Sequence, residues 1–360
     1  MPARIIPNVA TFSQQLIQWY HRHHRDLPWR RTIDPYKIWL SEIILQQTRV
    51  IQGTPYYERF VETYPTVQSL ANAEEQDVLR LWQGLGYYSR ARNLHHTARQ
   101  VVAEFDGKFP DSYAELLKLK GVGEYTAAAI ASFAFNEAVP AVDGNVYRVL
   151  ARIFGLKTDI MHSSAKREFT AMAGRLIPAA DPATFNQALI EFGAIQCQPV
   201  APDCLICPFN DSCYAFEHGA QNRLPVKSKK AKVRNRYLNY IVLEEDGQLA
   251  MKERSAKDVW KGLYDFPLIE TSQEANVPDD LAGSTQLNQW IAANRLSVPQ
   301  KTYVHLLTHQ KLYVKFWEIE MSNVQTVELP DYASFYNKAE IEALPKPILI
   351  DTYIKEQFFS

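Results

Sequence analysis

Cysteine is scarce in this sequence, and long apolar runs are missing from it. All four cysteines of the 360 residues lie from Cys197 to Cys213, which excludes a disulfide framework because such a framework spreads its pairs along a chain. No window is apolar over the length needed to span a bilayer, and residues 1–4 precede no apolar stretch. We therefore expect an intracellular, cytoplasmic protein with no membrane attachment.

Net charge is also nearly absent, at −1, but the two signs are unevenly distributed. Residues 1–236 carry 28 Lys and Arg against 22 Asp and Glu, whereas residues 237–360 carry 11 against 18. The basic run at residues 227–236 contains no acid and indicates an interdomain linker between domains at 1–226 and 237–360. The linker is either simply solvated or lies along a polyanion such as a DNA backbone.

The spacing of apolar residues changes at this linker. Before it, apolar residues recur at helical spacing, and after it most segments alternate as strands do. We therefore expect an all-α first domain followed by an α+β domain. The predicted helices are 12–19, 38–45, 79–82, 113–119, 127–135, 286–293 and 348–358, and the predicted strands are 237–243, 248–252 and 312–319, with a hairpin turn at 245–247.

The cysteines form a candidate metal site. Six, two and five residues separate Cys197, Cys204, Cys207 and Cys213. Four thiolates suit tetrahedral zinc, but zinc sites commonly pair two short Cys-x-x-Cys knuckles across a longer loop. A single compact run of uneven spacing suits an iron–sulfur cubane better. The spacing favours a 4Fe–4S cluster and leaves zinc as the alternative.

One acid stands where a helix should be buried. Residues 38–45 are apolar almost all round, and Glu42 is their only charge. A buried carboxylate needs either an ion pair, for which Arg30 and Arg49 are candidates, or a raised pKa that keeps it protonated. The ion pair would be structural, whereas the raised pKa suits a general acid. The residues alone leave both open.

Two further motifs stand at predicted helix starts. Gly121 and Gly123 permit a tight turn and leave the following helix N-terminus bare for close approach. Asp143 precedes Gly-Asn and an apolar helix, so its default role is an N-cap worth about 1 kcal/mol. Capping would also fix the carboxylate and keep it ionised.

Several runs resemble one family. They are DLPWR at 26–30, DPY at 34–36, SEIILQQTRV at 41–50, GLGYYSR at 84–90, the glycine turn with Asp143, and the cysteine loop. Together they resemble the MutY adenine glycosylases, which belong to the helix–hairpin–helix DNA glycosylases with endonuclease III. The resemblance covers residues 25–213. It implies an all-α helix–hairpin–helix glycosylase domain with an iron–sulfur loop at 197–213.

The resemblance also implies roles for individual residues. Glu42 matches the glutamate that protonates N7 of adenine and then assists water, and Asp143 matches the aspartate that stabilises the sugar cation. Asn145 matches a residue that orients this chemistry. The other matches concern DNA: Trp29 and Arg30 line the adenine pocket, Gln47 and Tyr87 push into the duplex while adenine is extruded, Thr48 belongs to the same DNA-binding set, and Gly121 and Gly123 hold a phosphate.

Tyr125 distinguishes this chain from the bifunctional relatives. Endonuclease III-like enzymes carry a lysine just after the glycine turn, and its amine attacks the sugar and cleaves the strand through a Schiff base. This chain has Tyr125 at that position. Because a phenol cannot form an imine, we predict a monofunctional glycosylase that leaves an abasic site.

The second domain resembles the Nudix-like C-terminal domain of the same family, through DVWKGLYDFP at 258–267 and VHLLTH at 304–309. No glutamate cluster follows Gly262 to hold the divalent metal of a Nudix hydrolase, so we expect lesion recognition rather than hydrolysis. In the family this recognition loop reads 8-oxoguanine and is usually Phe-Ser-His. Here it is Leu307, Thr308 and His309, which keeps the hydroxyl and the histidine but lacks the aromatic ring.

The predicted partner is therefore double-stranded DNA with adenine opposite 8-oxoguanine or guanine, bound by a monomer. One alternative is a related mismatch glycosylase that acts on another base, such as thymine, and another is a non-catalytic lesion-binding protein. The pocket residues Trp29, Arg30 and Glu42 argue against the first alternative. Retention of both Glu42 and Asp143 argues against the second.

Overall fold

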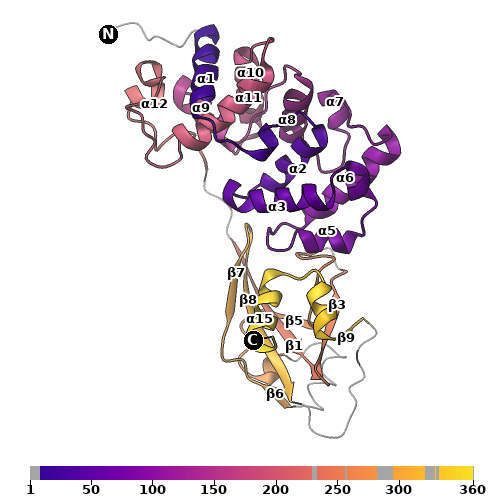
Figure 1. The fold of residues 1–360 in the computed structure, drawn as a ribbon. Helices are drawn as coiled ribbons and strands as arrows, with labels where there is room; N and C mark the ends of the chain where they lie inside the picture. Colours follow the sequence, from indigo (N-terminus) through magenta and orange to yellow (C-terminus); the bar gives the residue numbers. More distant parts are fainter. Residues whose placement is uncertain are drawn as a thin grey trace. The chain divides into compact units, whose positions relative to one another are not determined.

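The structure is a computed structural model that describes residues 9–228, 233–255, 258–281, 295–320, 329 and 332–359. The chain divides into two compact units (Figure 1). The helical unit comprises Met1–Asn72 and Asn93–Lys229, and the sheet unit comprises Ala73–Arg92 and Lys230–Ser360. Across the described ranges, no helix is both long enough and apolar enough to cross a membrane.

The helical unit is built from short helices around a core of aromatic and aliphatic side chains, among them Phe12, Phe169 and Phe185. These side chains come from helices far apart in the sequence, so burying them holds the unit together. The elements are α1 (Val9–His23), η1 (Pro28–Arg30), α2 (Pro35–Leu45), α3 (Val50–Thr63), α4 (Val67–Ala71), most of α6 (Ser89–Phe105), α7 (Tyr113–Leu116), α8 (Glu124–Phe135), α9 (Gly144–Phe154), α10 (Ser163–Leu176), α11 (Pro182–Glu191), the π-helix η2 (Phe192–Gln196), η3 (Asn210–Ser212) and α12 (Tyr214–Glu217).

Two helices carry the residues that matter for the site, and both are buried along most of their length. Helix α2 begins after Asp34, whose side chain accepts a hydrogen bond from the Tyr36 backbone N–H, with Pro35 in the first turn. Helix α8 is rich in alanine and packs against α2 and α11. The predicted helices at 12–19, 38–45 and 127–135 are confirmed, whereas the one at 113–119 ends early as α7.

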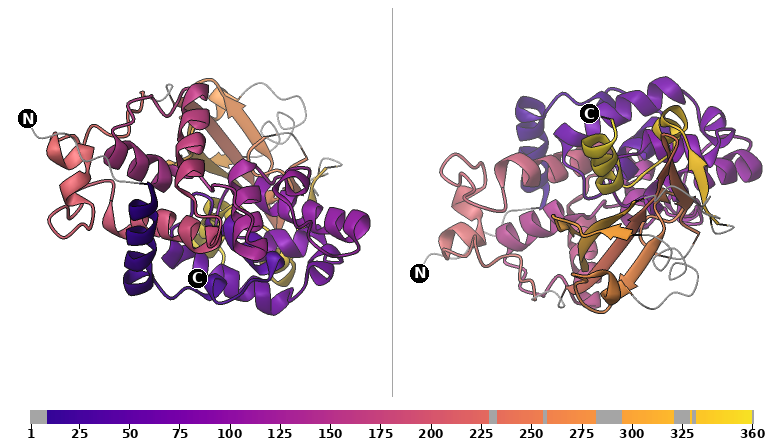
Figure 2. Two further views of the ribbon diagram at one scale, coloured as in Figure 1. Left: turned by 90° about the horizontal axis from the view of Figure 1, so that it is seen from above. Right: turned by 90° about the horizontal axis from the view of Figure 1, so that it is seen from below.

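The cysteine loop and α12 pack beside α1 and α9, as Figure 2 shows from two further sides. The Phe209 ring in this loop lies 4.8 Å from the Phe12 ring, measured between centroids. Phe209 therefore anchors the cysteine loop to the core of the helical unit.

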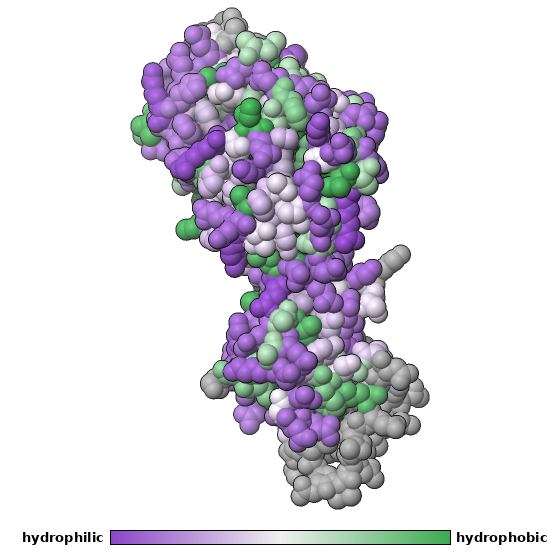
Figure 3. Space-filling view, turned by 45° about the vertical axis from the view of Figure 1, so that its right-hand side comes forward, coloured by the Kyte–Doolittle hydropathy of each residue, from purple (hydrophilic) through white to green (hydrophobic). Residues whose placement is uncertain are grey.

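The outer surface is mainly hydrophilic on the face drawn in Figure 3, with apolar side chains scattered over it.

The sheet unit contains a larger and a smaller sheet. In the larger sheet the strand order is β5-β1-β8-β6, and β7 also pairs with β8. Strands β1 and β8 run parallel, and the other pairs of this sheet are antiparallel. The strands are β1 (Arg234–Val242), β2 (Glu244–Glu245), β3 (Gln248–Glu253), β4 (Tyr264–Asp265), β5 (Leu268–Thr271), β6 (Arg295–Ser297), β7 (Tyr303–Leu306), β8 (Gln310–Glu320) and β9 (Ser334–Tyr336).

Both faces of the larger sheet are covered. On one face Phe316 of β8 stacks on Tyr353 of α15 (Ile348–Gln357), with ring centroids 3.7 Å apart. On the other face Trp317 joins a second apolar cluster with Ile241 and Ile269. Successive residues of one strand point to opposite faces, so β8 serves both cores. The remaining helices are η4 (Pro278–Leu281), α14 (Lys338–Ala343) and α5 (Glu75–Leu81).

The expected order of a helical part followed by an α+β part is confirmed. The strands predicted at 237–243, 248–252 and 312–319 appear within β1, β3 and β8, the helix at 348–358 as α15, and the helix at 79–82 within the end of α5. Asp246 and Gly247 both have positive φ, as a two-residue hairpin turn requires. The helix predicted at 286–293 lies outside the described residues.

Two predicted boundaries differ from the structure. Strand β1 begins at Arg234, so residues 234–236 of the predicted linker belong to the strand, and residues 229–232 lie outside the described ranges. The segment Ala73–Arg92, predicted to be part of the first domain, groups with the sheet unit. One reason is a hydrogen bond of 3.2 Å from Gln76 Nε2 to the Tyr264 hydroxyl. Neither effect is visible in local spacing, because both depend on side chains distant in sequence.

Candidate active site

A cavity of about 880 Å³ lies in the helical unit, between η1, α2, the start of α8 and the start of α9. It brings together predicted catalytic and base-binding side chains that are up to 116 positions apart in the sequence, from Trp29 to Asn145. The predicted residues that line it are Trp29, Arg30, Glu42, Gln47, Thr48, Tyr125, Asp143 and Asn145. These predicted residues therefore line one continuous cavity.

Glu42 faces this cavity from α2, whose other side chains are largely buried. The pKa of Glu42 is raised to about 7, mainly because its side chain is buried and also because Asp143 lies nearby, while a hydrogen bond from Tyr125 and the charge of Arg30 oppose the rise. Of the two possibilities that the sequence left open, the raised pKa is the one found. The guanidinium of Arg30 is instead paired with another acid.

That acid is Glu191, at the end of α11, and its side chain is fully buried. Arg30 Nη2 donates to Glu191 Oε2 at 2.7 Å, and Arg25 donates to both carboxylate oxygens at 2.8 and 2.7 Å. These two arginines hold the pKa of Glu191 at about 2, against the opposing effect of burial. Neither Arg25 nor Glu191 was predicted from the sequence, although Glu191 is the only charge among the apolar residues 188–195, the same signal that revealed Glu42.

Asp143 caps α9 and points into the same cavity. One carboxylate oxygen accepts from the backbone N–H groups of Asn145 and Val146 at 2.9 Å each, and the other accepts from Asn145 Nδ2 at 2.7 Å. Burial raises the pKa of Asp143, and these donors act against that rise because they stabilise the ionised form. The N-cap and the cavity-facing carboxylate are thus the same group.

Arg148 extends this network toward the cysteine loop. Its Nη2 donates to Asn145 Oδ1 at 2.8 Å and to the Gly193 carbonyl at 2.6 Å, and its Nε donates to the Cys197 carbonyl at 2.8 Å. Arg148 was not predicted from the sequence. It follows Asn145 by three residues on a helix, and residues at that spacing lie side by side. Asp143, Asn145 and the cysteine loop are therefore joined by hydrogen bonds.

Tyr125 and the two glycines ahead of it have separate environments. Burial and the neighbouring acids Glu42 and Asp143 raise the pKa of Tyr125 well above its usual value, so its phenol stays neutral. Gly121 has a φ of +78°, and a Cβ there would lie 2.7 Å from Asn93 Cβ, so only glycine fits. Gly123 is exposed at the N-cap of α8 with open space beside it, which suits close approach of an anion.

The four cysteines surround one small cavity, and no disulfide joins them. Polar groups border it: Arg152 Nη1 lies 3.5 Å from Cys197 Sγ, and Gln221 Nε2 lies 4.0 Å from Cys204 Sγ. In the ranges that the structure describes, no three Cys, His, Asp or Glu side chains are placed to hold a single metal ion. Four thiols around a shared space can ligate a tetrahedral metal ion or an iron–sulfur cluster.

The remaining predicted residues lie in the sheet unit and not in the cavity lining. Leu307, Thr308 and His309 form the three-residue loop between β7 and β8. The Tyr87 and Thr308 hydroxyls hydrogen-bond to each other. Tyr87 has a φ of +48° and Gln47 in the helical unit a φ of +56°, conformations that non-glycine residues seldom adopt and that cluster at functional sites.

Comparison with known proteins gives two family matches. Residues 40–173 match the HhH-GPD superfamily base excision DNA repair proteins, and residues 239–356 match the NUDIX domain. The chain is 32% identical to an adenine DNA glycosylase of Buchnera aphidicola subsp. Baizongia pistaciae over 96% of this chain and 97% of that protein. The human adenine DNA glycosylase is 42% identical over 61% of this chain and 42% of the human protein.

Solved structures give the same fold for the helical part. A thermostable thymine-DNA glycosylase is similar with a TM-score of 0.53 and 29% identity, over 57% of this chain and 95% of that one. A non-covalent endonuclease III–DNA complex is similar with a TM-score of 0.51 and 24% identity, over 58% and 95%. The helical architecture is thus that of endonuclease III-like glycosylases.

Proposed function

This chain belongs to the adenine DNA glycosylases of the HhH-GPD base excision repair superfamily, and on that premise we propose that it removes adenine mispaired with 8-oxoguanine, or with guanine, from duplex DNA. The observation that carries the proposal is Glu42, which has a pKa of about 7 and shares a cavity with Asp143. A carboxyl that is partly protonated at neutral pH can act as a general acid.

The proposed reaction uses both acids. The Glu42 carboxyl donates its proton to adenine N7, after which the C1′–N9 bond breaks and its electron pair passes to the adenine ring. The Asp143 carboxylate, held by Asn145 and Val146, stabilises the positive charge that develops on the sugar. Water then bonds to C1′ and gives its proton to Glu42, which leaves free adenine and an abasic site.

The same site is proposed to cleave no DNA strand. A strand-cleaving glycosylase needs an amine that attacks C1′, and the position near Glu42 is held by Tyr125, whose phenol stays neutral because its pKa is raised. Trp29, Arg30, Gln47 and Thr48 line the cavity and are proposed to receive the extruded base. Tyr87 is proposed to enter the duplex, and Gly121 and Gly123 to hold a phosphate.

Cys197, Cys204, Cys207 and Cys213 are proposed to hold a 4Fe–4S cluster, which the HhH-GPD family of endonuclease III and MutY generally binds. Their shared cavity and free thiols suit ligation of one metal group, and their uneven spacing supports the cluster over zinc. When bound, the cluster would supply four iron–thiolate bonds that order the loop. In the sheet unit, the recognition loop Leu307, Thr308 and His309 is proposed to read the base opposite adenine.

The test is single-turnover base release from matched duplexes carrying adenine opposite 8-oxoguanine, guanine, cytosine or thymine, with a T·G duplex beside them. We expect fast adenine release opposite 8-oxoguanine and strand breaks only after alkali. Thymine release would instead place the chain with the thymine-DNA glycosylase that it resembles in structure. Glu42→Gln is the matched variant: base release that survives the substitution would contradict the assigned acid, whereas lost release with intact duplex binding would support it.

A further inference from the structure

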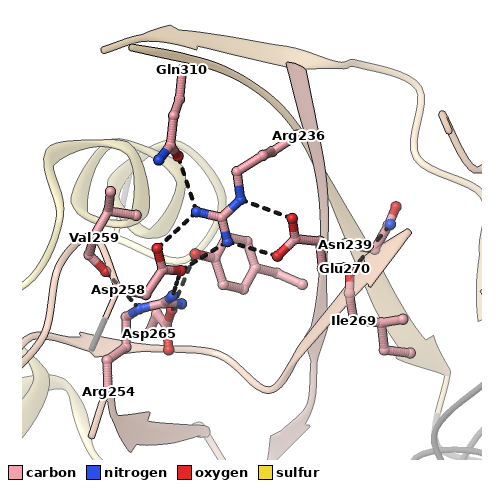
Figure 4. Close-up of polar contacts among 10 residues, drawn as sticks. Arg236, Asn239, Arg254, Asp258, Val259, Asp265, Ile269, Glu270 and Gln310 are labelled. Carbon is pink, nitrogen blue, oxygen red and sulfur yellow. Dashed lines mark hydrogen bonds and ion pairs between the residues drawn. The ribbon is translucent and has the colours of Figure 1, made fainter. Parts of the chain in front are cut away.

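A buried charge network lies in the sheet unit and includes Arg236, Asp258, Glu270 and Gln310 (Figure 4). Its centre is Arg236 on β1, which is 8% exposed. Arg236 pairs with two carboxylates, Asp258 with both oxygens at 2.8 Å and Glu270 with its two oxygens at 2.8 and 2.6 Å. Arg254 joins the network through Asp258 at 3.1 Å.

Arg236 has no spare hydrogen-bond donor. A guanidinium carries five N–H groups. Four of them go to Asp258 and Glu270, and the fifth, on Nη1, goes to the side-chain oxygen of Gln310 at 3.0 Å. A lysine at this position would keep the charge but offer only three donors without the planar fork, so it could not make all five hydrogen bonds.

Gln310 connects this network to the recognition loop. It is the first residue of β8, and its carbonyl accepts the Leu307 backbone N–H at 2.8 Å, which closes the three-residue loop. Strand β1 holds the same loop a second time, because the Arg234 backbone N–H donates to the His309 carbonyl at 3.0 Å. The loop is therefore fixed from β1 through one backbone bond and one side-chain bond.

We propose that Arg236 is a positioning residue for specificity, which holds Gln310 and thereby sets the conformation in which Leu307, Thr308 and His309 read the base opposite adenine. This inference rests on the proposed reading of 8-oxoguanine by that loop. Side chains that recognise a base must be held to within about half an ångström by packing and hydrogen bonds from a rigid element. A strand anchored by a fully satisfied arginine provides that support.

The experiment compares single-turnover adenine release opposite 8-oxoguanine and opposite guanine in wild type, Gln310→Met and Arg236→Lys. Gln310→Met removes only the acceptor that faces Arg236 and leaves both carboxylate pairs in place. We expect its preference for 8-oxoguanine over guanine to fall about tenfold, the effect of one lost hydrogen bond to a charged group. Release opposite guanine should stay unchanged, and Arg236→Lys should lower the preference at least as much.

Lys315→Met is the matched control. Lys315 lies on β8, is 8% exposed and donates a hydrogen bond to the Ala275 carbonyl at 2.7 Å. Its other partners, Asn276 and Glu274, also lie outside the recognition loop. An equal loss of preference in Lys315→Met would overturn the inference, because general destabilisation of the sheet unit would then explain the effect. Unchanged preference in Gln310→Met beside a discriminating wild type would overturn it as well.

The two proposals fail in different ways. A wild-type protein that releases adenine equally fast opposite 8-oxoguanine and guanine would contradict the proposed reading of the lesion and the inference that rests on it. A wild type that discriminates, together with variants that discriminate equally well, would contradict only the role of Arg236 and Gln310. Thermal unfolding of each variant, followed by near-ultraviolet circular dichroism, confirms that the compared proteins are folded.

Discussion

Glu42 lies on a helix whose neighbouring side chains are buried, and burial is the largest cause of its raised pKa. A solvated glutamate would be almost fully ionised at neutral pH and a poor proton donor. Neighbouring groups also change this pKa, because Asp143 raises it while Arg30 and Tyr125 lower it. The acidity of this group is thus determined by residues from four separate segments of the chain.

The rate of base release should follow the protonation of Glu42. Because the reaction begins with proton donation, single-turnover release should be fastest below the pKa of about 7 and decline above it. The decline should approach about tenfold per pH unit, as for any essential acid. The measurement is the release rate opposite 8-oxoguanine between about pH 5.5 and about pH 8.5. A rate that rises through neutral pH would contradict the role of Glu42 as the proton donor.

The sequence singles out individual residues more readily than the ion pairs that they form. An acid in an apolar helix was enough to single out Glu42, because burial of a charge is visible in local sequence. The partner of Arg30 is not visible in local sequence, because Glu191 lies 161 residues away and the two meet only in the folded chain. For the same reason the sequence could not decide between an ion pair and a raised pKa at Glu42.

At the scale of elements, the π-helix Phe192–Gln196 joins α11 to the cysteine loop and passes close to the start of α9. Short π-helical segments are rare in proteins, but those that occur are often found at functional sites. Gly193 makes the approach possible, because a Cβ there would lie 2.6 Å from Asn145 Cβ and 2.9 Å from the Asn145 carbonyl oxygen. One of those contacts is to backbone, so it cannot be relieved by turning a side chain.

Gly193→Ala should therefore displace Asn145 and, through it, the Asp143 carboxylate. We expect single-turnover release to fall by about a hundredfold, the cost of misplacing a catalytic group by roughly an ångström. Duplex affinity, measured by fluorescence anisotropy, should change little. Gly174→Ala on α10 is the control, because its Cβ would meet nothing closer than 4.0 Å. Equal rates for the two variants would show that the close approach at Gly193 does not position the carboxylate.

Elements with a local signal were predicted, and those defined by tertiary contact were not. The turn at Asp246 and Gly247 requires positive φ, which these residue types adopt readily, so the hairpin could be read from the sequence. The start of β1 could not, because its basic residues have the composition of a linker. Residues 234–236 belong to the strand because they pair with residues 310–312 of β8, and the charge of Arg236 is matched there by Asp258 and Glu270.

At the scale of the whole molecule, the folding free energy contains two carboxylates with opposite pH dependence. Glu191 has a pKa lowered to about 2 from an ordinary 4.5, so its stabilisation is present above pH 4.5 and is lost as the pH falls toward 2. Glu42 has a pKa raised to about 7, so its contribution is fully present below pH 4.5 and is lost as the pH rises through 7. The contribution of Glu42 to stability is therefore present at the pH where its carboxyl is protonated and can donate a proton, and it is lost at alkaline pH.

Glu42→Gln should consequently stabilise the protein at alkaline pH while abolishing base release. At about pH 8 the wild type keeps an ionised carboxylate in a buried position, and removing that charge should raise the free energy of unfolding by at most about 3 kcal/mol. At about pH 4.5 the carboxyl is protonated in the folded protein, so the two proteins should differ little. Denaturant unfolding of both proteins at the two pH values measures the difference. An equal difference in unfolding free energy at the two pH values would mean that burial of the charged Glu42 does not oppose folding. The pKa of Glu42 would then have to be raised by DNA binding instead.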